Sequence, residues 1–302
     1  MKKSVQAEII ISACMDFFIL RGYLYPYNMQ PEPEKYNNWN KMQYSLAKNY
    51  FEEFKGALKL PKEHAMVMDI GCGSGNITNE VLFNILNKNV NLKKIIGTDI
   101  NEEMIEFANA RYLNKKLEFR AMNICTRELP EALEGKFDLV TAFSSFHWFP
   151  DQKLALKNIR RLLKPNGELF LMFSTESMLW NTYKRMKENP KWSSYIQNVS
   201  TTVDNCLPSS GDYFEFFRAE DFSIRSLRFE KHTFRYKNGD ETRRMIEHLS
   251  HFKETIPEHL WSELIDDNFE VYKDMLKTQK EYNAADERDF PASRVIVHAI
   301  KL

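Results

Sequence analysis

The stretch Met68-Asp69-Ile70-Gly71-Cys72-Gly73-Ser74-Gly75 decides the fold of this 302-residue chain. The short apolar run 65–70 predicts a buried strand, and residues 77–87 carry apolar side chains at helical spacing. Three glycines between a strand and a helix allow the backbone to turn sharply and to approach a ligand closely. The same pattern is also compatible with a tight strand-to-helix turn that binds nothing.

The spacing D-x-G-x-G-x-G narrows the kind of ligand that this loop would take. Dinucleotide-binding loops have the spacing G-x-G-x-x-G, and phosphate-binding loops end in Lys-Ser or Lys-Thr; this loop has neither pattern. A ligand without a phosphate group therefore fits better, and we expect Asp69 to engage an ammonium group of that ligand.

Strand and helix signals alternate regularly between residues 65 and 174. Asn101 is expected to cap the helix after the second strand, and the turn 165–167 should link the helix 151–163 to the fifth strand. This order predicts an α/β fold with a doubly wound, mostly parallel sheet covered on both faces, completed by an antiparallel C-terminal strand. The strands expected after the first are 94–100, 117–124, 137–145, 168–174 and the final one, 294–302.

Four regions follow from this pattern. They are an N-terminal extension of unknown role (1–28), a ligand-binding core (29–175), a helical cap or insertion (176–280) and a segment that returns to the sheet (281–302). The cap contains one strand-like segment, 222–236, between helical stretches. The apolar run 9–20 is interrupted by Asp16 and is too short to span a bilayer, so we expect neither a signal peptide nor membrane insertion.

Charge and cysteine usage argue against several classes of function. The chain has 42 basic and 42 acidic side chains, so no net charge draws it to nucleic acid or to an anionic membrane. The cysteines form no C-x-x-C pair and lie near no histidine cluster, so we expect no metal site. Free thiols in a reducing, cytoplasmic compartment are the simplest interpretation. The cysteines are Cys14, Cys72, Cys125 and Cys206.

A second signal for the ligand is Asp99, at the end of the second expected strand in Gly97-Thr98-Asp99-Ile100. An acidic residue at this position accepts hydrogen bonds from ribose hydroxyls in doubly wound folds. The alternative is a helix cap, since Asp often stands at such boundaries. The glycine loop and Asp99 together are more specific than either one alone.

With these residues the chain resembles the class I S-adenosyl-methionine-dependent methyltransferases. The loop 69–75 resembles the first motif of that family, Phe137-Asp138-Leu139-Val140 its fourth-strand motif, and residues 162–169 (LLKPNGEL) the segment before strand five. The resemblance implies S-adenosyl-methionine as cofactor. Asn123-Ile124 stands where the family usually has Asp-Ile, but an amide oxygen can still accept from the adenine amine. The implied cofactor-binding residues are Asp69, Gly71, Cys72, Gly73, Gly75, Asp99, Ile100, Asn123, Ile124 and Ser144.

A narrower resemblance is to the arthropod juvenile hormone acid O-methyltransferases. It is carried by residues 36–43 (YNNWNKMQ), 144–152 (SSFHWFPDQ) and 184–192, although the His-Trp pair also occurs in trans-aconitate methyltransferases. It implies that Gln43 and Trp148 contact the carboxylate of a small apolar acid such as juvenile hormone acid or farnesoic acid. His147 is then either a base toward a hydroxyl substrate or a structural imidazole.

Three alternatives stay open at this point. The first is an enzyme that methylates apolar acids, with aromatic residues of 176–280 lining a tunnel. The second is an enzyme that methylates a different small acid such as aconitate. The third is a protein that binds a lipid or a cofactor without turnover. The same aromatic residues are equally compatible with the core of the cap. A homodimer is compatible with the sequence, and a nucleic-acid substrate is not favoured.

Overall fold

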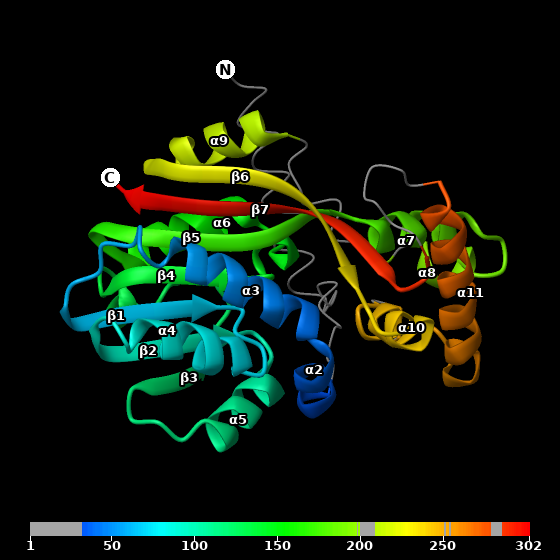
Figure 1. Cartoon of the computed structure of the whole chain (residues 1–302), viewed down its shortest axis with the longest axis horizontal. Coiled ribbons are helices and arrows are strands. Elements are labelled where there is room, and N and C mark those ends of the chain that lie inside the picture. The colour runs from blue at the N-terminus through cyan, green and yellow to red at the C-terminus, as the bar shows by residue number, and fades with distance from the viewer. Residues whose placement is uncertain (1–31, 198, 200–208, 251, 254, 279–285) are drawn as a thin grey trace.

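The computed structural model describes residues 32–197, 199, 209–250, 252–253, 255–278 and 286–302; the extension 1–28, Cys14 and Cys206 lie outside them. One sheet of seven strands forms the centre of the fold, in the order β3-β2-β1-β4-β5-β7-β6 (Figure 1). Its strands are β1 (Glu63–Ile70), β2 (Asn91–Asp99), β3 (Leu117–Ala121), β4 (Phe137–Phe143), β5 (Leu163–Ser177), β6 (Phe222–Arg235) and β7 (Asp289–Lys301).

The direction of the strands confirms the predicted fold class. β1 to β5 run parallel to one another, whereas β7 runs antiparallel to both β5 and β6. Because the order reverses at β1 and β4, the carboxyl ends of these two strands meet at the point where doubly wound sheets bind ligands. The strand-like segment 222–236 lies in this same sheet, as its edge beyond β7.

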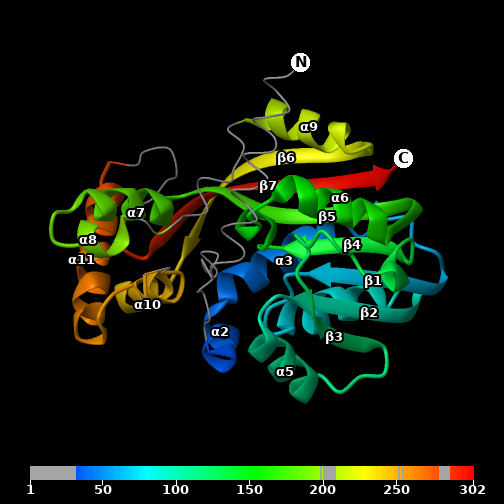
Figure 2. The same cartoon turned by 180° about the vertical axis from the view of Figure 1, so that it is seen from behind.

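Two apolar clusters cover the two faces of the sheet. The first packs α3 (Lys41–Phe54), the π-helical segment η1 (Ile77–Phe83), α4 (Asn84–Leu86) and α5 (Glu102–Arg111) on one face. The second packs α6 (Gln152–Leu162) and α9 (Ser210–Ala219) on the other face, as the two views show (Figures 1 and 2). Strands covered on both faces explain the nearly continuous apolar runs in the sequence.

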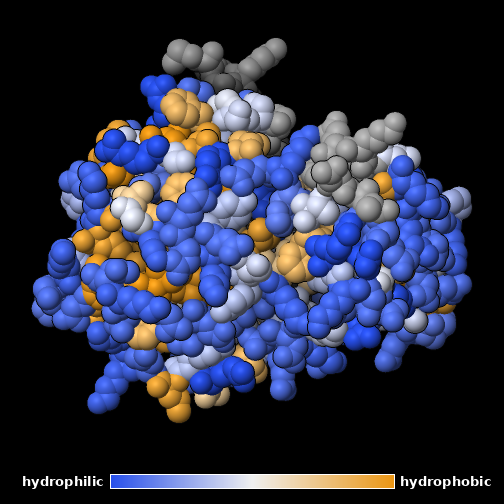
Figure 3. Space-filling model, viewed as in Figure 1, coloured by the Kyte–Doolittle hydropathy of each residue, from blue (hydrophilic) through white to orange (hydrophobic). Residues whose placement is uncertain are grey.

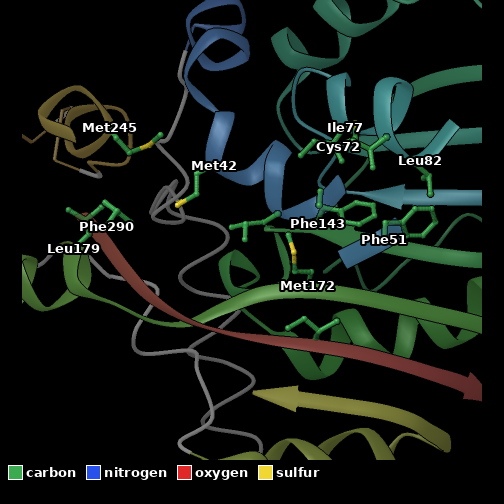
Figure 4. Close-up of a cluster of buried hydrophobic side chains, with 14 of the residues drawn as sticks. Met42, Phe51, Cys72, Ile77, Leu82, Phe143, Met172, Leu179, Met245 and Phe290 are labelled. Carbon is green, nitrogen blue, oxygen red and sulfur yellow. The ribbon is translucent and has the colours of Figure 1, made fainter. Parts of the chain in front are cut away.

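The helices α7 (Met178–Glu188), α8 (Ser193–Ile196), α10 (Gly239–His248) and α11 (Glu258–Leu276) lie together at one end of the sheet, which we call the cap. The strands β5, β6 and β7 extend toward it, and it faces the carboxyl ends of the parallel strands (Figures 1 and 2). The first apolar cluster continues into the cap: Met42, Phe143 and Met172 lie on the sheet side, with Leu179, Met245 and Phe290 on the cap side (Figure 4).

Element bounds differ from the predicted ones mainly where hydrogen-bond partners extend a strand. β5 begins at Leu163, directly after α6, so the expected turn 165–167 lies inside the strand as an irregularity, with Asn166 at a φ of +60°. β3 ends at Ala121, three residues before its predicted end, so Asn123 and Ile124 follow the strand. Asn101 caps α5 as predicted, since its side chain accepts from the backbone N–H of Met104 at 3.2 Å.

The outer surface carries mostly polar groups on the face of Figure 1, with apolar residues gathered in small patches (Figure 3). Within the part of the chain that the structure describes, no helix is both long enough and apolar enough to cross a membrane.

Candidate active site

The glycine loop turns at the carboxyl end of β1 through three left-handed residues. Gly71, Gly73 and Gly75 have φ values of +68°, +52° and +77°, a region that side chains disfavour. A Cβ atom at Gly71 would lie 2.3 Å from Cβ of Ser145, and one at Gly75 would lie 2.8 Å from the ring of Phe119. Glycine is therefore required both by the backbone conformation and by the close neighbours.

Asp69 lies beneath this loop with its carboxylate buried. The hydroxyls of Thr78 and Thr141 donate to its two oxygens at 2.6 and 2.8 Å. Burial raises the pKa of Asp69 to about 6, although both hydroxyl contacts act in the opposite direction. Asp69 thus connects β1 to η1 and β4, and its contact with an ammonium group stays a prediction.

Asp99 faces the loop from the end of β2. Its carboxylate accepts from the backbone N–H of Gly73 at 2.8 Å and from that of Asn101 at 3.0 Å. Burial raises its pKa, an effect that these N–H groups partly offset. The next side chain, Ile100, is apolar yet 49% exposed. An acid beside an exposed apolar side chain presents both a hydrogen-bond acceptor for ribose and a packing surface for a flat base.

A short helix that the sequence patterns did not predict, α2 (Pro33–Trp39), packs against the glycine loop. The Ser74 hydroxyl donates to Asn37 Oδ1 at 3.1 Å, and the amides of Asn40 and Asn76 exchange two hydrogen bonds of 3.0 Å. Burial, with Asp99 nearby, raises the pKa of Tyr36 to about 12. The run of asparagines at 37, 38 and 40 was the signal in the sequence for these contacts.

The remaining predicted cofactor residues lie around the same end of the sheet. Asn123 Oδ1 accepts from the backbone N–H of Cys125 at 2.8 Å, and the Ile124 carbonyl accepts from Asn158 at 2.8 Å. Cys72 is buried, and burial raises the pKa of its thiol well above the ordinary value. Ser144 follows β4 with a φ of +54°, a strained conformation typical of functional sites.

His147 and Trp148 stand in a short helical turn after β4. The backbone N–H of Ser174 donates to His147 Nδ1 at 3.4 Å, and the imidazole lies between the rings of Trp148 and Trp180, with centroids 5.0 and 5.6 Å away. Since Nδ1 is the acceptor, a neutral His147 carries its proton on Nε2. This arrangement favours an orienting role over that of a general base.

Gln43 lies on α3, on the buried side of the helix. Its carbonyl oxygen Oε1 is buried and has no hydrogen-bond partner among the described residues. A buried amide without a partner costs free energy, so the site is expected to satisfy it when a ligand binds. Rotation of the amide by 180° places its NH₂ group at the same point, where it can donate to a carboxylate.

The aromatic residues expected in a tunnel or in the core of the cap divide between two places. Trp180, Tyr183, Trp192 and Phe252 are buried in the first cluster, which joins sheet and cap. Phe216 and Phe217 of α9 instead pack on the opposite face of the sheet, away from the glycine loop. The first group therefore lies on the side of the sheet that carries α3 and the cap, and Phe216 and Phe217 do not.

The sheet order, the glycine loop and the acid at the end of β2 define a class I methyltransferase. A family model described as "Methyltransferase domain" matches residues 61–230, and the chain belongs to this family. Its methyl donor is S-adenosyl-methionine. A methyltransferase structure from Bacillus halodurans superimposes with a TM-score of 0.56 at 15% identity, covering 84% of this chain and 99% of the other. At that identity the likeness concerns the fold.

Two insect proteins are similar to this chain over most of its length. The chain is 28% identical over 273 residues to the juvenile hormone acid O-methyltransferase of Drosophila melanogaster, covering 88% of this chain and 91% of the relative. It is 26% identical over 244 residues to the enzyme of the same name from Bombyx mori, covering 80% and 85%.

The residues fit the cofactor. The loop has no side chains at the three positions where its backbone turns, Asp99 has an oxygen beside Gly73, and the exposed Ile100 offers an apolar surface for a purine. Among residues 32–302, apart from the gaps in their description, no group of three or more His, Cys, Asp or Glu side chains is arranged to hold a metal ion.

Proposed function

We propose that the chain transfers a methyl group from S-adenosyl-methionine to the carboxylate of an apolar acid of the juvenile hormone acid or farnesoic acid type. The observation that carries the proposal is the hydrogen bond from the Ser174 N–H to His147 Nδ1, because it engages the lone pair that a neutral His147 would need as a base. A base is dispensable only for a nucleophile that is already ionised. Carboxylates ionise near pH 4. The names and coverage of the insect relatives support the same substrate class.

In this proposal Asp99 and the backbone of the glycine loop hold the cofactor, and Ile100 packs against its base. When bound, the cofactor supplies an electrophilic methyl group, which an oxygen nucleophile takes while the sulfur keeps the bonding electron pair. Trp148 and Gln43 donate neutral hydrogen bonds that orient the substrate carboxylate. The apolar surroundings from the sheet and the cap remove its water, which strengthens the attack.

We also propose that the cap, within 176–280, supplies the substrate side and that residues 29–175 form the cofactor side. Met172 and Phe143 from the sheet, with Met245 from the cap, belong to one apolar cluster that suits an aliphatic tail (Figure 4). Each methylene of the tail that becomes buried should contribute about 0.8 kcal/mol to binding. A cytoplasmic step in juvenile hormone biosynthesis is the corresponding biological role.

A methyl-transfer screen tests the proposal. Labelled S-adenosyl-methionine is incubated with farnesoic acid, juvenile hormone acid, straight-chain fatty acids and aconitate, and the ester products are identified. The wild type should prefer the isoprenoid acids, and Gln43→Ala and Trp148→Phe should each lower kcat by about 10- to 100-fold, because orientation is lost. Preference for aconitate would refute the isoprenoid substrate. Full activity of both variants would refute the roles of Gln43 and Trp148.

A further inference from the structure

Arg294 of β7 is a buried cation without an anionic partner. It is only 1% exposed, its Nη2 donates to Met42 Sδ at 3.7 Å, and its Nε has no hydrogen-bond partner. Among the described residues no carboxylate forms an ion pair with it. A buried charge is costly unless it is paired, so a chain that keeps one at such a place has a use for it.

The carboxylate across the sheet is already engaged elsewhere. Glu230 of β6 is the cross-strand partner of Arg294. Its side chain, however, pairs with Arg228 Nε at 3.3 Å and accepts from the Tyr50 hydroxyl. Among the described residues, Glu230 therefore forms no ion pair with the guanidinium of Arg294.

Arg294 lies between the two segments that the proposed function assigns to the substrate carboxylate. On one side it contacts Met42, the residue before Gln43 on α3. On the other side its cross-strand partner in β5 is Ser174, whose backbone N–H donates to His147. Directly opposed residues of antiparallel strands project from the same face of the sheet, so Arg294 is on the side of α3 and the first apolar cluster.

Other polar atoms near Arg294 also lack partners. The hydroxyl of Tyr236 and Nε2 of His232, which both sense the charge of Arg294, are buried and unbonded. Oε1 of Gln43, which follows Met42 in the chain, is unbonded too. Burial and the charge of Arg294 both lower the pKa of His232, which keeps its imidazole neutral. Burial lowers the pKa of Arg294 itself to about 10, so its guanidinium stays charged at neutral pH. One cation surrounded by unsatisfied neutral groups is suited to bind an anion.

We propose that Arg294 binds one oxygen of the substrate carboxylate and makes the site selective for the acid over its methyl ester. The inference rests on the proposed function. Contact with a single oxygen leaves the other oxygen, oriented by Gln43 and Trp148, available for attack. Methylation removes the negative charge, so the contact that holds the substrate is lost with the product, and the neutral ester is released.

The test measures binding and does not depend on turnover. Titration calorimetry in the presence of S-adenosyl-homocysteine gives the Kd of farnesoic acid and of methyl farnesoate. The wild type should prefer the acid by about 10- to 100-fold, the scale of a hydrogen bond between charged groups. Arg294→Met should remove this preference, with little change in the affinity for S-adenosyl-homocysteine. Arg161→Met, which removes a cation paired with Glu134 on the other side of the sheet, should keep the preference.

Stability without ligand separates binding from a structural role. Arg294→Met replaces an unpaired buried charge by an apolar side chain, so its Tm should rise by a few degrees. Arg294→Gln provides a second neutral variant if the Met protein is not recovered folded. A lower Tm in both variants would make Arg294 structural and overturn the proposal. An unchanged preference for the acid in these variants would also overturn the proposal, even if the enzyme is shown to methylate acids. Failure of the wild type to prefer the acid would refute the proposal, whereas the ester products of the methyl-transfer screen decide the acid substrate independently.

Discussion

The replacement of Gly71 by Ala tests the assignment of the glycine loop most directly. Two costs follow from the structure. The φ of +68° costs an L-residue about 1–2 kcal/mol. The new Cβ would lie 2.3 Å from Cβ and 2.6 Å from Oγ of Ser145, whose hydroxyl donates to the Ile70 carbonyl at 2.8 Å. Displacing Ser145 breaks this hydrogen bond and adds about 1–2 kcal/mol, for a total of about 3 kcal/mol.

Two other glycines separate these costs. Gly135 has a φ of +60°, and a Cβ there would meet nothing within 4 Å, so Gly135→Ala carries the backbone cost alone. Gly56 is not left-handed and also has open space, so Gly56→Ala should change stability by less than about 1 kcal/mol. Urea unfolding of the three variants should rank them Gly71→Ala, Gly135→Ala and Gly56→Ala, from least to most stable.

The same variants test the site. Because Gly71 shapes the loop that we propose holds the cofactor, Gly71→Ala should weaken binding of S-adenosyl-homocysteine by at least about 10-fold in calorimetry. Gly135→Ala, remote from the loop in sequence, should leave this affinity unchanged. If Gly71→Ala unfolds at the same urea concentration as Gly135→Ala and keeps its affinity for S-adenosyl-homocysteine, the close packing of Gly71 on Ser145 affects neither stability nor cofactor binding.

Three further predictions concern carboxylates and one of the groups that contact them. Burial raises the pKa of Asp69 from 3.8 to about 6. The protonated carboxyl therefore adds about 3 kcal/mol to the free energy of unfolding below about pH 4, and this contribution is lost as the pH rises through 6. Urea midpoints between pH 4 and 7 should fall less steeply for Asp69→Asn, and an unchanged slope would contradict this origin. Asp99→Ala should weaken cofactor binding by about 1.5–3 kcal/mol, measured by calorimetry, and equal affinity would disprove the ribose contact. His298 Nε2 and Glu168 Oε2 lie 2.6 Å apart and both side chains are buried, so His298→Leu should lower the free energy of unfolding by about 3–5 kcal/mol; a urea midpoint equal to that of the wild type would show that the pair is dispensable.

The sequence predicted the fold where the signals were local. The order of strands and helices, the glycine loop and the cap at Asn101 all depend on residues close together in the chain, and the structure confirms them. Strand ends were predicted less well, because hydrogen bonds to a neighbouring strand decide them. β7 begins at Asp289 because β6 is paired with it from that residue onward, five residues before the predicted start at Arg294.

The candidate site also contains residues that the sequence pointed to and one that only the structure reveals. The roles of Gln43 and Trp148 stay predictions. Nothing in the sequence singled out Arg294, since arginine in a strand is usually exposed. Only the pairing of β7 with β5 and β6 brings Arg294 beneath α3 and excludes water from it.

By itself, therefore, the sequence determined the class of fold and the glycine turn after β1, because periodicity and glycine spacing act over a few residues. Tertiary structure alone decided that Asn40 meets Asn76 and that Arg294 is left unpaired between Met42 and Ser174. These contacts join residues distant in the chain, and whether a buried charge has a partner depends on which elements pack around it.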